Sequence, residues 1–133
     1  MARFLALLLS GLLLASPGRA LPPLHEDPNV VNGFYAIGLA DELRKNCSTI
    51  HARLFRAYNF LKSLENYALK AGYTEAEIDQ LVDNSAEKER LRSRIRGDLK
   101  ARGASPQSPE GYCAVGREEI AKGSMAGRLL RAN

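Results

Sequence analysis

Apolar residues recur every three or four positions over most of the chain, which is the period of an α-helix. The first periodic segment runs from Val30 to Cys47, and Asp27 followed by Pro28 has the order of a helix cap and a first helical residue. The stretch Asn46–Thr49 interrupts this segment, so we expect a break or a kink there, although one continuous helix also fits. Strand-like alternation is absent throughout. The pattern predicts an all-α fold.

The second segment has the widest apolar surface in the chain. Aromatic side chains such as Phe55 and Phe60 extend this surface beyond a single helical stripe. A helix that is apolar over more than half of its circumference is normally buried. We therefore expect a central helix over residues 49–71, ended by Gly72 in a left-handed cap.

Three further helices are expected in the second half of the chain. Thr74 and Glu77 have the spacing of a capping box that opens the first of them. The second covers residues 86–102 and carries a narrow apolar stripe, which consists of Leu91, Ile95 and Leu99. The third starts at Pro109, after a cap at Ser108, and ends at Gly123. Together these segments predict a small bundle of about five helices.

The first 20 residues have the layout of a cleaved secretory signal peptide. Arg3 precedes an apolar run over residues 4–14, and Gly18 and Ala20 place small residues at the cleavage-determining positions. The apolar run is shorter than the roughly 20 residues that a membrane span needs. A retained anchor is the alternative. We predict a signal peptide at 1–20 and a single helical domain at 21–133.

Charge argues against a nucleic-acid partner. The chain has 19 Lys and Arg residues against 15 Asp and Glu residues, and cleavage would remove Arg3 and Arg19. The remaining 17 basic and 15 acidic residues make a nearly neutral protein. Domains that bind nucleic acids are usually strongly basic, so none is expected as a partner.

The two cysteines, Cys47 and Cys113, are expected to pair, because exported proteins with two cysteines usually form a disulfide. The bond would staple the bundle by joining the end of the first helix to the last helix. A metal or small-ligand site is the alternative, because His51 would share a helical face with Cys47. Structural zinc sites usually have closely spaced cysteine pairs, which this chain lacks.

Motifs for catalysis or cofactor binding are missing from the sequence. It has no C-x-x-C pair, no glycine-rich phosphate loop and no G-x-S-x-G element. A cysteine nucleophile with His51 as its base would require a free thiol in an oxidising compartment. We therefore predict a protein that is not an enzyme and holds no cofactor.

A run of basic residues in the fourth expected helix is the other candidate site. It consists of Arg90, Arg92, Arg94, Arg96 and Lys100. Such a face can bind anions, a protein partner or the surface of an anionic membrane. The favoured interpretation is an ordinary solvated face in which arginines pair with glutamates along the helix.

Three segments resemble a known family. They are residues Gly38–Cys47, Gly72–Ile78 and Tyr112–Ser124. They are similar to small exported alphaproteobacterial proteins that form a domain-of-unknown-function family of the 5333 type. The resemblance implies an exported, periplasmic or secreted bacterial protein, and it brings no catalytic residues with it.

Two functions fit these observations. The first is a non-enzymatic envelope factor that binds a partner protein, and an exposed apolar patch would favour it. The second is a small-ligand or metal binder that uses the region of Cys47, His51 and Cys113, and free thiols would favour it.

Overall fold

The computed structural model describes Gly18 and residues 20–133, so almost all of the predicted signal peptide lies outside the described residues. In chain order the elements are a 3₁₀ turn (Leu24–Glu26), α1 (Pro28–Asn46), β1 (Ile50–Ala52), α2 (Leu54–Ala71), α3 (Glu75–Asp83), α4 (Ser85–Ala101), α5 (Glu110–Lys122), α6 (Met125–Arg128) and β2 (Leu130–Ala132). The prediction of a helical bundle is confirmed, and the short α6 is added to the five helices expected.

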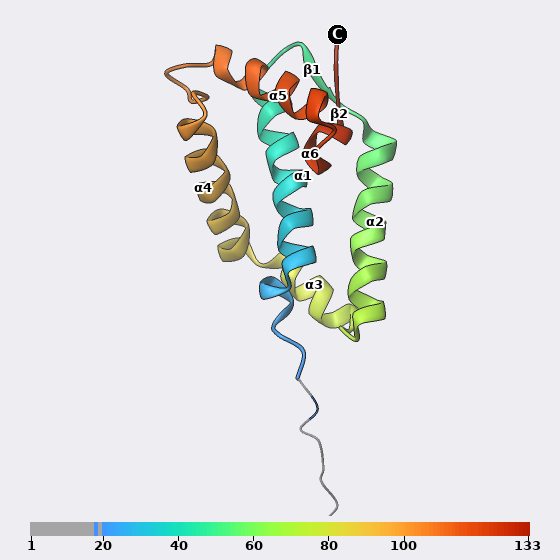
Figure 1. The fold of residues 1–133 in the computed structure, drawn as a ribbon. Coiled ribbons are helices and arrows are strands. Elements are labelled where there is room, and N and C mark those ends of the chain that lie inside the picture. The colour runs from blue at the N-terminus through green and yellow to red at the C-terminus, as the bar shows by residue number, and fades with distance from the viewer. Residues whose placement is uncertain (1–17, 19) are drawn as a thin grey trace, which may run out of the picture.

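Helix α1 occupies the centre of the molecule (Figure 1). It lies between α2 and α4, while α5 and α6 cross its C-terminal end and α3 lies near its N-terminal end. Its inward residues are buried, and Leu43 is fully inaccessible to solvent. The prediction that residues 49–71 form the central helix is wrong, because α1 takes that place.

Helix α2 is instead a peripheral helix. Ala68 is its only buried residue. One side of α2 packs on α1, where Leu64 fills the space left by the missing side chain of Gly33. The rest of its wide apolar surface has no neighbouring element to cover it within residues 20–133, and this explains why apolar character alone misplaced the helix.

A two-stranded antiparallel sheet closes the top of the bundle (Figure 1). Ile50 pairs with Ala132, and Ala52 pairs with Leu130. The expected break after Asn46 is confirmed, but the chain continues as β1, and the helix expected from residue 49 begins only at Leu54. The expected absence of strands is therefore wrong, because three-residue strands are too short to show alternation.

Local capping residues set most helix boundaries. The Asp27 side chain accepts hydrogen bonds from the backbone N–H groups of the first turn of α1. Thr74 and Glu77 form the predicted capping box of α3. Gly72 ends α2 with a φ of 107°, in the left-handed region that glycine favours. The cap of α4 is Asn84, and Pro109 precedes α5 where Ser108 was expected as the cap.

Two apolar cores hold the elements together. The main core lies at the C-terminal end of α1, where Leu43, Ile50, Ile95, Leu99 and Leu130 are almost fully buried. A smaller core at the opposite end gathers Leu24, Val30, Ala68 and Tyr73. None of the helices described is both long and apolar enough to cross a membrane.

Candidate functional site

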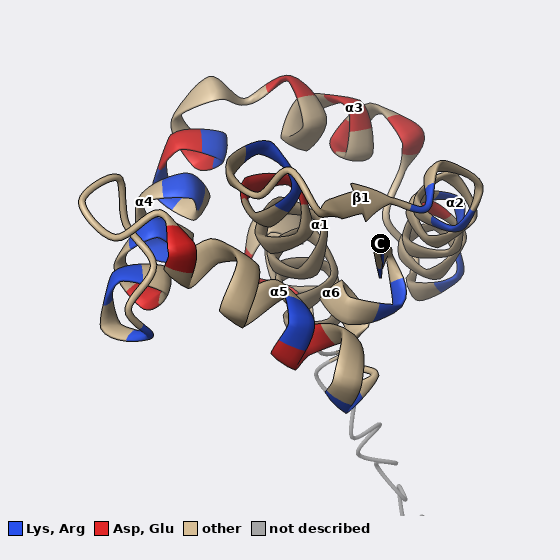
Figure 2. Ribbon diagram, turned by 90° about the horizontal axis from the view of Figure 1, so that it is seen from above, with Lys and Arg blue, Asp and Glu red and all other residues tan. Residues whose placement is uncertain are grey.

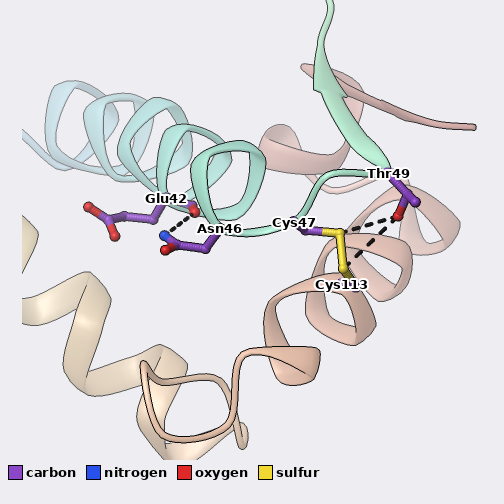
Figure 3. Close-up of a disulfide and its surroundings, with 5 residues drawn as sticks. All are labelled: Glu42, Asn46, Cys47, Thr49 and Cys113. Atoms are coloured by element: carbon purple, nitrogen blue, oxygen red, sulfur yellow. Dashed lines mark hydrogen bonds between the residues drawn. A yellow bond between two sulfur atoms is a disulfide. The ribbon is translucent and has the colours of Figure 1, made fainter.

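The two cysteines form the predicted disulfide. Cys47 and Cys113 are 66 residues apart in the chain, and their α-carbons lie 5.2 Å apart, within the range that a disulfide requires. Figure 3 shows the bond between the end of α1 and α5, with the hydroxyl of Thr49 directed at it. This hydroxyl donates to Cys47 Sγ at 3.2 Å. The bond therefore fixes the position of α5 across the end of α1.

The alternative site at Cys47, His51 and Cys113 is not supported. Both sulfur atoms are consumed by the disulfide, so neither is available as a thiolate ligand or a nucleophile. His51 lies in β1, and the four-residue spacing from Cys47 no longer places the two on one helical face. Among the residues that the structure describes, no group of three His, Cys, Asp or Glu side chains is placed to hold a metal ion.

The predicted basic face on α4 is divided in two. Arg90 and Arg94 lie one turn apart and line a cavity between α1, α3 and α4. Arg92 lies about 200° of helix rotation from Arg90, and neither it nor Arg96 lines this cavity. The apolar stripe of α4 lies between Arg94 on one side and Arg92 on the other, and of the five basic residues only Arg90 and Arg94 line the cavity.

Pairing with carboxylates is uneven along α4. Arg92 pairs with Glu89 at 3.8 Å, and Arg96 lies 3.7 Å from Glu42 of α1. These arginines fit the solvated, paired face that the sequence favoured. Lys100 is exposed and forms no ion pair with any described residue.

Arg94 is held by an aromatic ring and not by a carboxylate. Its guanidinium lies 4.8 Å from the centre of the Tyr35 ring, in a cation–π contact. The Tyr35 hydroxyl donates to Asp98 at 2.7 Å, which fixes the ring. Burial, together with the hydrogen bond and charge of Asp98, raises the pKa of Tyr35 to about 12. The Arg94 guanidinium is thus held in position by the Tyr35 ring, and no carboxylate among the described residues forms an ion pair with it.

The cavity beside Arg94 has a volume of about 300 Å³. Its apolar walls come from three helices and consist of Val30, Val31, Phe34, Leu81, Val82 and Leu91. A second cavity of about 170 Å³ adjoins it and shares Val30, Phe34, Leu81 and Val82. The two adjoining hollows are lined mainly by apolar side chains.

A second apolar surface lies on the outside of α2. We call it the α2 face, and it consists of Leu54, Phe55, Tyr58, Leu61 and Leu69. Leu54 is 76% exposed and Phe55 is 78% exposed. At about 100° per residue these positions fall within one arc of the helix. Large apolar side chains gathered in this way are typical of an interaction surface.

Four arginines surround the start of α2. They are Arg53, Arg56, Arg128 and Arg131, and all four are exposed. The chain between α6 and β2 lies against the start of α2, because the backbone N–H of Arg53 donates to Leu129 O at 2.8 Å and its side-chain Nε–H donates to Leu130 O at 2.9 Å. None of the four forms an ion pair with any carboxylate in the described part of the chain. Figure 2 shows basic segments on α2 and near the C-terminus.

The buried carboxylate of Glu119 belongs to the framework of the fold. It accepts a hydrogen bond from Arg102 at 2.7 Å and one from Ser124. Burial acts to lower the pKa of Arg102, but its hydrogen bonds to Glu119 and Glu118 outweigh that effect and the pKa is raised. This group connects the end of α4 to the α5–α6 turn.

Comparison with protein families matches residues 22–131 to the family of unknown function DUF5333. The chain belongs to this family. A search of curated proteins and a search of solved structures found no match. The match to DUF5333 covers the whole predicted mature domain except its first and last few residues, and the alphaproteobacterial origin implied by the resemblance stays a prediction.

Sequence reasoning found the cationic part of this DUF5333 chain's cavity but missed its apolar walls. The sequence pattern names Arg90 and Arg94 as candidates, but it does not single out Val31, Phe34 or Leu81 as parts of a site. The i, i+4 spacing of Arg90 and Arg94 beside Leu91 was an available signal. The sequence analysis also did not identify the α2 face as exposed. The signal that could have indicated it is the apolar arc of this helix, which is too wide for one neighbouring helix to cover.

Proposed function

We propose that this chain is an exported, non-enzymatic binding protein that docks a partner protein on the α2 face. The exposure of the α2 face carries the proposal, because Leu54 and Phe55 at the start of the helix are both more than three-quarters exposed. An apolar arc that the fold leaves uncovered is a ready site for association. The disulfide supports export, since such bonds persist in oxidising compartments.

The chemistry of the partner follows from the charges beside this face. Arg53, Arg56, Arg128 and Arg131 lie around the N-terminal end of α2 and have no carboxylate partners among residues 20–133. An acidic segment on the partner would be attracted to them, and apolar side chains on the same segment would cover Phe55 and Tyr58. The partner is therefore a protein that presents an acidic segment with interspersed apolar residues.

Site-specific photo-crosslinking in cells that export the protein tests this proposal. A photoreactive residue at position 55 or 58 is expected to crosslink one partner protein, and mass spectrometry is expected to map the crosslink to an acidic, apolar segment. Position 92 is the matched control, because Arg92 is exposed but lies on α4 away from the α2 face. Arg56→Glu is expected to abolish the crosslink at position 55 without changing the melting temperature.

Two results would overturn the proposal. Crosslinks from positions 55 and 58 to a second copy of the chain would make the α2 face a homodimer interface. Equal crosslinking at positions 55 and 92, or none at either, would show that the α2 face has no specific partner.

A further inference from the structure

The cavity of about 300 Å³ between α1, α3 and α4 is lined by none of the residues of the α2 face. Helix α4, which contributes its basic residues, and α2 lie on opposite sides of α1 (Figure 1). The walls of the cavity are apolar, but its rim carries three cations, Lys88, Arg90 and Arg94, against the single carboxylate of Glu87. An apolar interior with cations at one edge matches a molecule with an apolar tail and an anionic head.

The rim leaves two of these cations available to a ligand. Arg90 pairs with Glu87 at 2.6 Å, so its charge is balanced. Lys88 and Arg94 form no ion pair with any carboxylate in the described part of the chain. Stacking on Tyr35 holds the Arg94 guanidinium in place at 4.8 Å from the ring centre. A head group bound there would meet a positioned guanidinium and an exposed lysine. The donor fork of an arginine suits a carboxylate or a phosphate.

The volume limits the length of the tail. A carbon-sized group occupies about 30 Å³, which is the share of one water molecule in the liquid. A cavity of about 300 Å³ therefore holds roughly ten such groups. The adjoining cavity shares four wall residues and can take the end of a slightly longer chain. Two acyl chains would not fit into this space. The ligand is therefore a single-chain molecule.

We propose that this cavity binds a single-chain anionic amphiphile, with its acyl tail among Phe34, Leu81 and Leu91 and its head group on Arg94 and Lys88. A free fatty acid and a lipid with one acyl chain share this chemistry. Val82 is 42% exposed and lines both cavities, which places the entrance at α3.

Calorimetric titration with saturated fatty acids below their micelle concentrations tests the tail. The protein is expressed from the full chain and kept oxidised. Affinity is expected to rise about fourfold for each added methylene, since burial of a methylene contributes about 0.8 kcal/mol. The rise is expected to stop near decanoate to dodecanoate, where the cavity is full. Affinity that does not depend on chain length would overturn the proposal.

Three variants test where the head group and the acyl tail of the ligand bind. Arg94→Met is expected to weaken decanoate binding by about 10- to 100-fold, the loss of one charged hydrogen bond, and to leave decanol binding unchanged. Arg92→Met, on the opposite side of α4, is the matched control and is expected to have no effect. Val82→Trp fills the entrance and is expected to weaken decanoate and decanol binding by at least about tenfold. Melting temperatures check that each variant is folded, and Lys88→Met replaces Arg94→Met if the latter unfolds.

The same titrations also distinguish a free fatty acid from a single-chain lipid as the ligand. Lysophosphatidylglycerol represents lipids with one acyl chain, and decanoate represents free fatty acids. The compound that binds more tightly shows which of the two classes supplies the ligand. Binding only to vesicles of two-chain phosphatidylglycerol would overturn the proposal in favour of membrane-surface binding. Equal losses in Arg92→Met and Arg94→Met would also overturn it. Phe55→Ser, which alters the α2 face, is expected to leave fatty-acid binding unchanged, so the two proposals can fail separately.

Discussion

Cys47 ends α1 and anchors the disulfide at the same position. Its backbone is extended, with φ −135° and ψ 117°, so the chain leaves the helix there and turns into β1. Gly116 of α5 lies where a β-carbon would come within 3.0 Å of the Ile50 side chain. The covalent bond and the missing side chain therefore act together to bring α5 against β1.

Removal of the disulfide is expected to destabilise the protein by about 2–5 kcal/mol. The bond closes a loop of 66 residues, for which chain entropy in the unfolded state accounts for roughly 4 kcal/mol. The double variant Cys47→Ser with Cys113→Ser avoids a free thiol and is expected to melt roughly 10 °C or more below the parent. Wild-type protein in reductant is the control and is expected to match the variant. Equal melting temperatures with and without reductant would contradict the prediction.

The backbone of helix α6 comes into direct contact with the backbone at the end of α5. A β-carbon added to Gly127 would lie 1.8 Å from the carbonyl oxygen of Glu119. The Ser124 hydroxyl accepts from the N–H of Gly127 at 2.9 Å and so caps α6 in the same place. This close approach directs the chain into β2, which pairs with β1 and completes the main core.

Gly127→Ala is expected to cost about 1–3 kcal/mol, because α6 must move away from α5 to admit the methyl group. Gly97→Ala is the matched control. Gly97 lies inside α4 with nothing within 4 Å of an added β-carbon, so this change is expected to stabilise the protein by about 0.5–1 kcal/mol. Urea unfolding of both variants measures the difference. Shifts of the same sign in the two variants would contradict this account.

The helices could be predicted from sequence more fully than their arrangement. Asp27, Thr74 and Gly72 act locally, so their capping roles can be read from neighbouring residues. The pairing of β1 with β2 depends on residues about 80 positions apart, and no local pattern indicates it. The wide apolar arc of α2 was interpreted as a sign of burial within the chain, whereas an exposed face that serves a partner has the same pattern.

The candidate site was predictable only in part for a similar reason. The charged residues of α4 stand out in the sequence, but the cavity depends on how α3 lies across α1 and α4. Phe34 and Leu81 are 47 positions apart and meet only in the folded chain. The sequence could therefore name Arg90 and Arg94 as candidates without showing what separates them from Arg92 and Arg96.

At the scale of the whole molecule, the first contacts seen in the described residues lie just beyond the predicted cleavage site. The Tyr73 hydroxyl donates to the carbonyl of Pro22 at 2.8 Å, and Leu21 lies against Gly72 at the turn between α2 and α3. The family match begins at residue 22. Cleavage after Ala20 would leave each of these contacts intact.

The exported protein is expected to begin at Leu21. The charged start, the apolar run and the small residues Gly18 and Ala20 together predict this site. N-terminal sequencing and intact mass of protein from the exported fraction measure it. Ala20→Leu is expected to block processing, because a large residue does not fit the cleavage position, whereas Pro22→Ala lies beyond the site and is expected to be processed normally. Exported protein that begins at Met1 would show that the leader is a retained anchor.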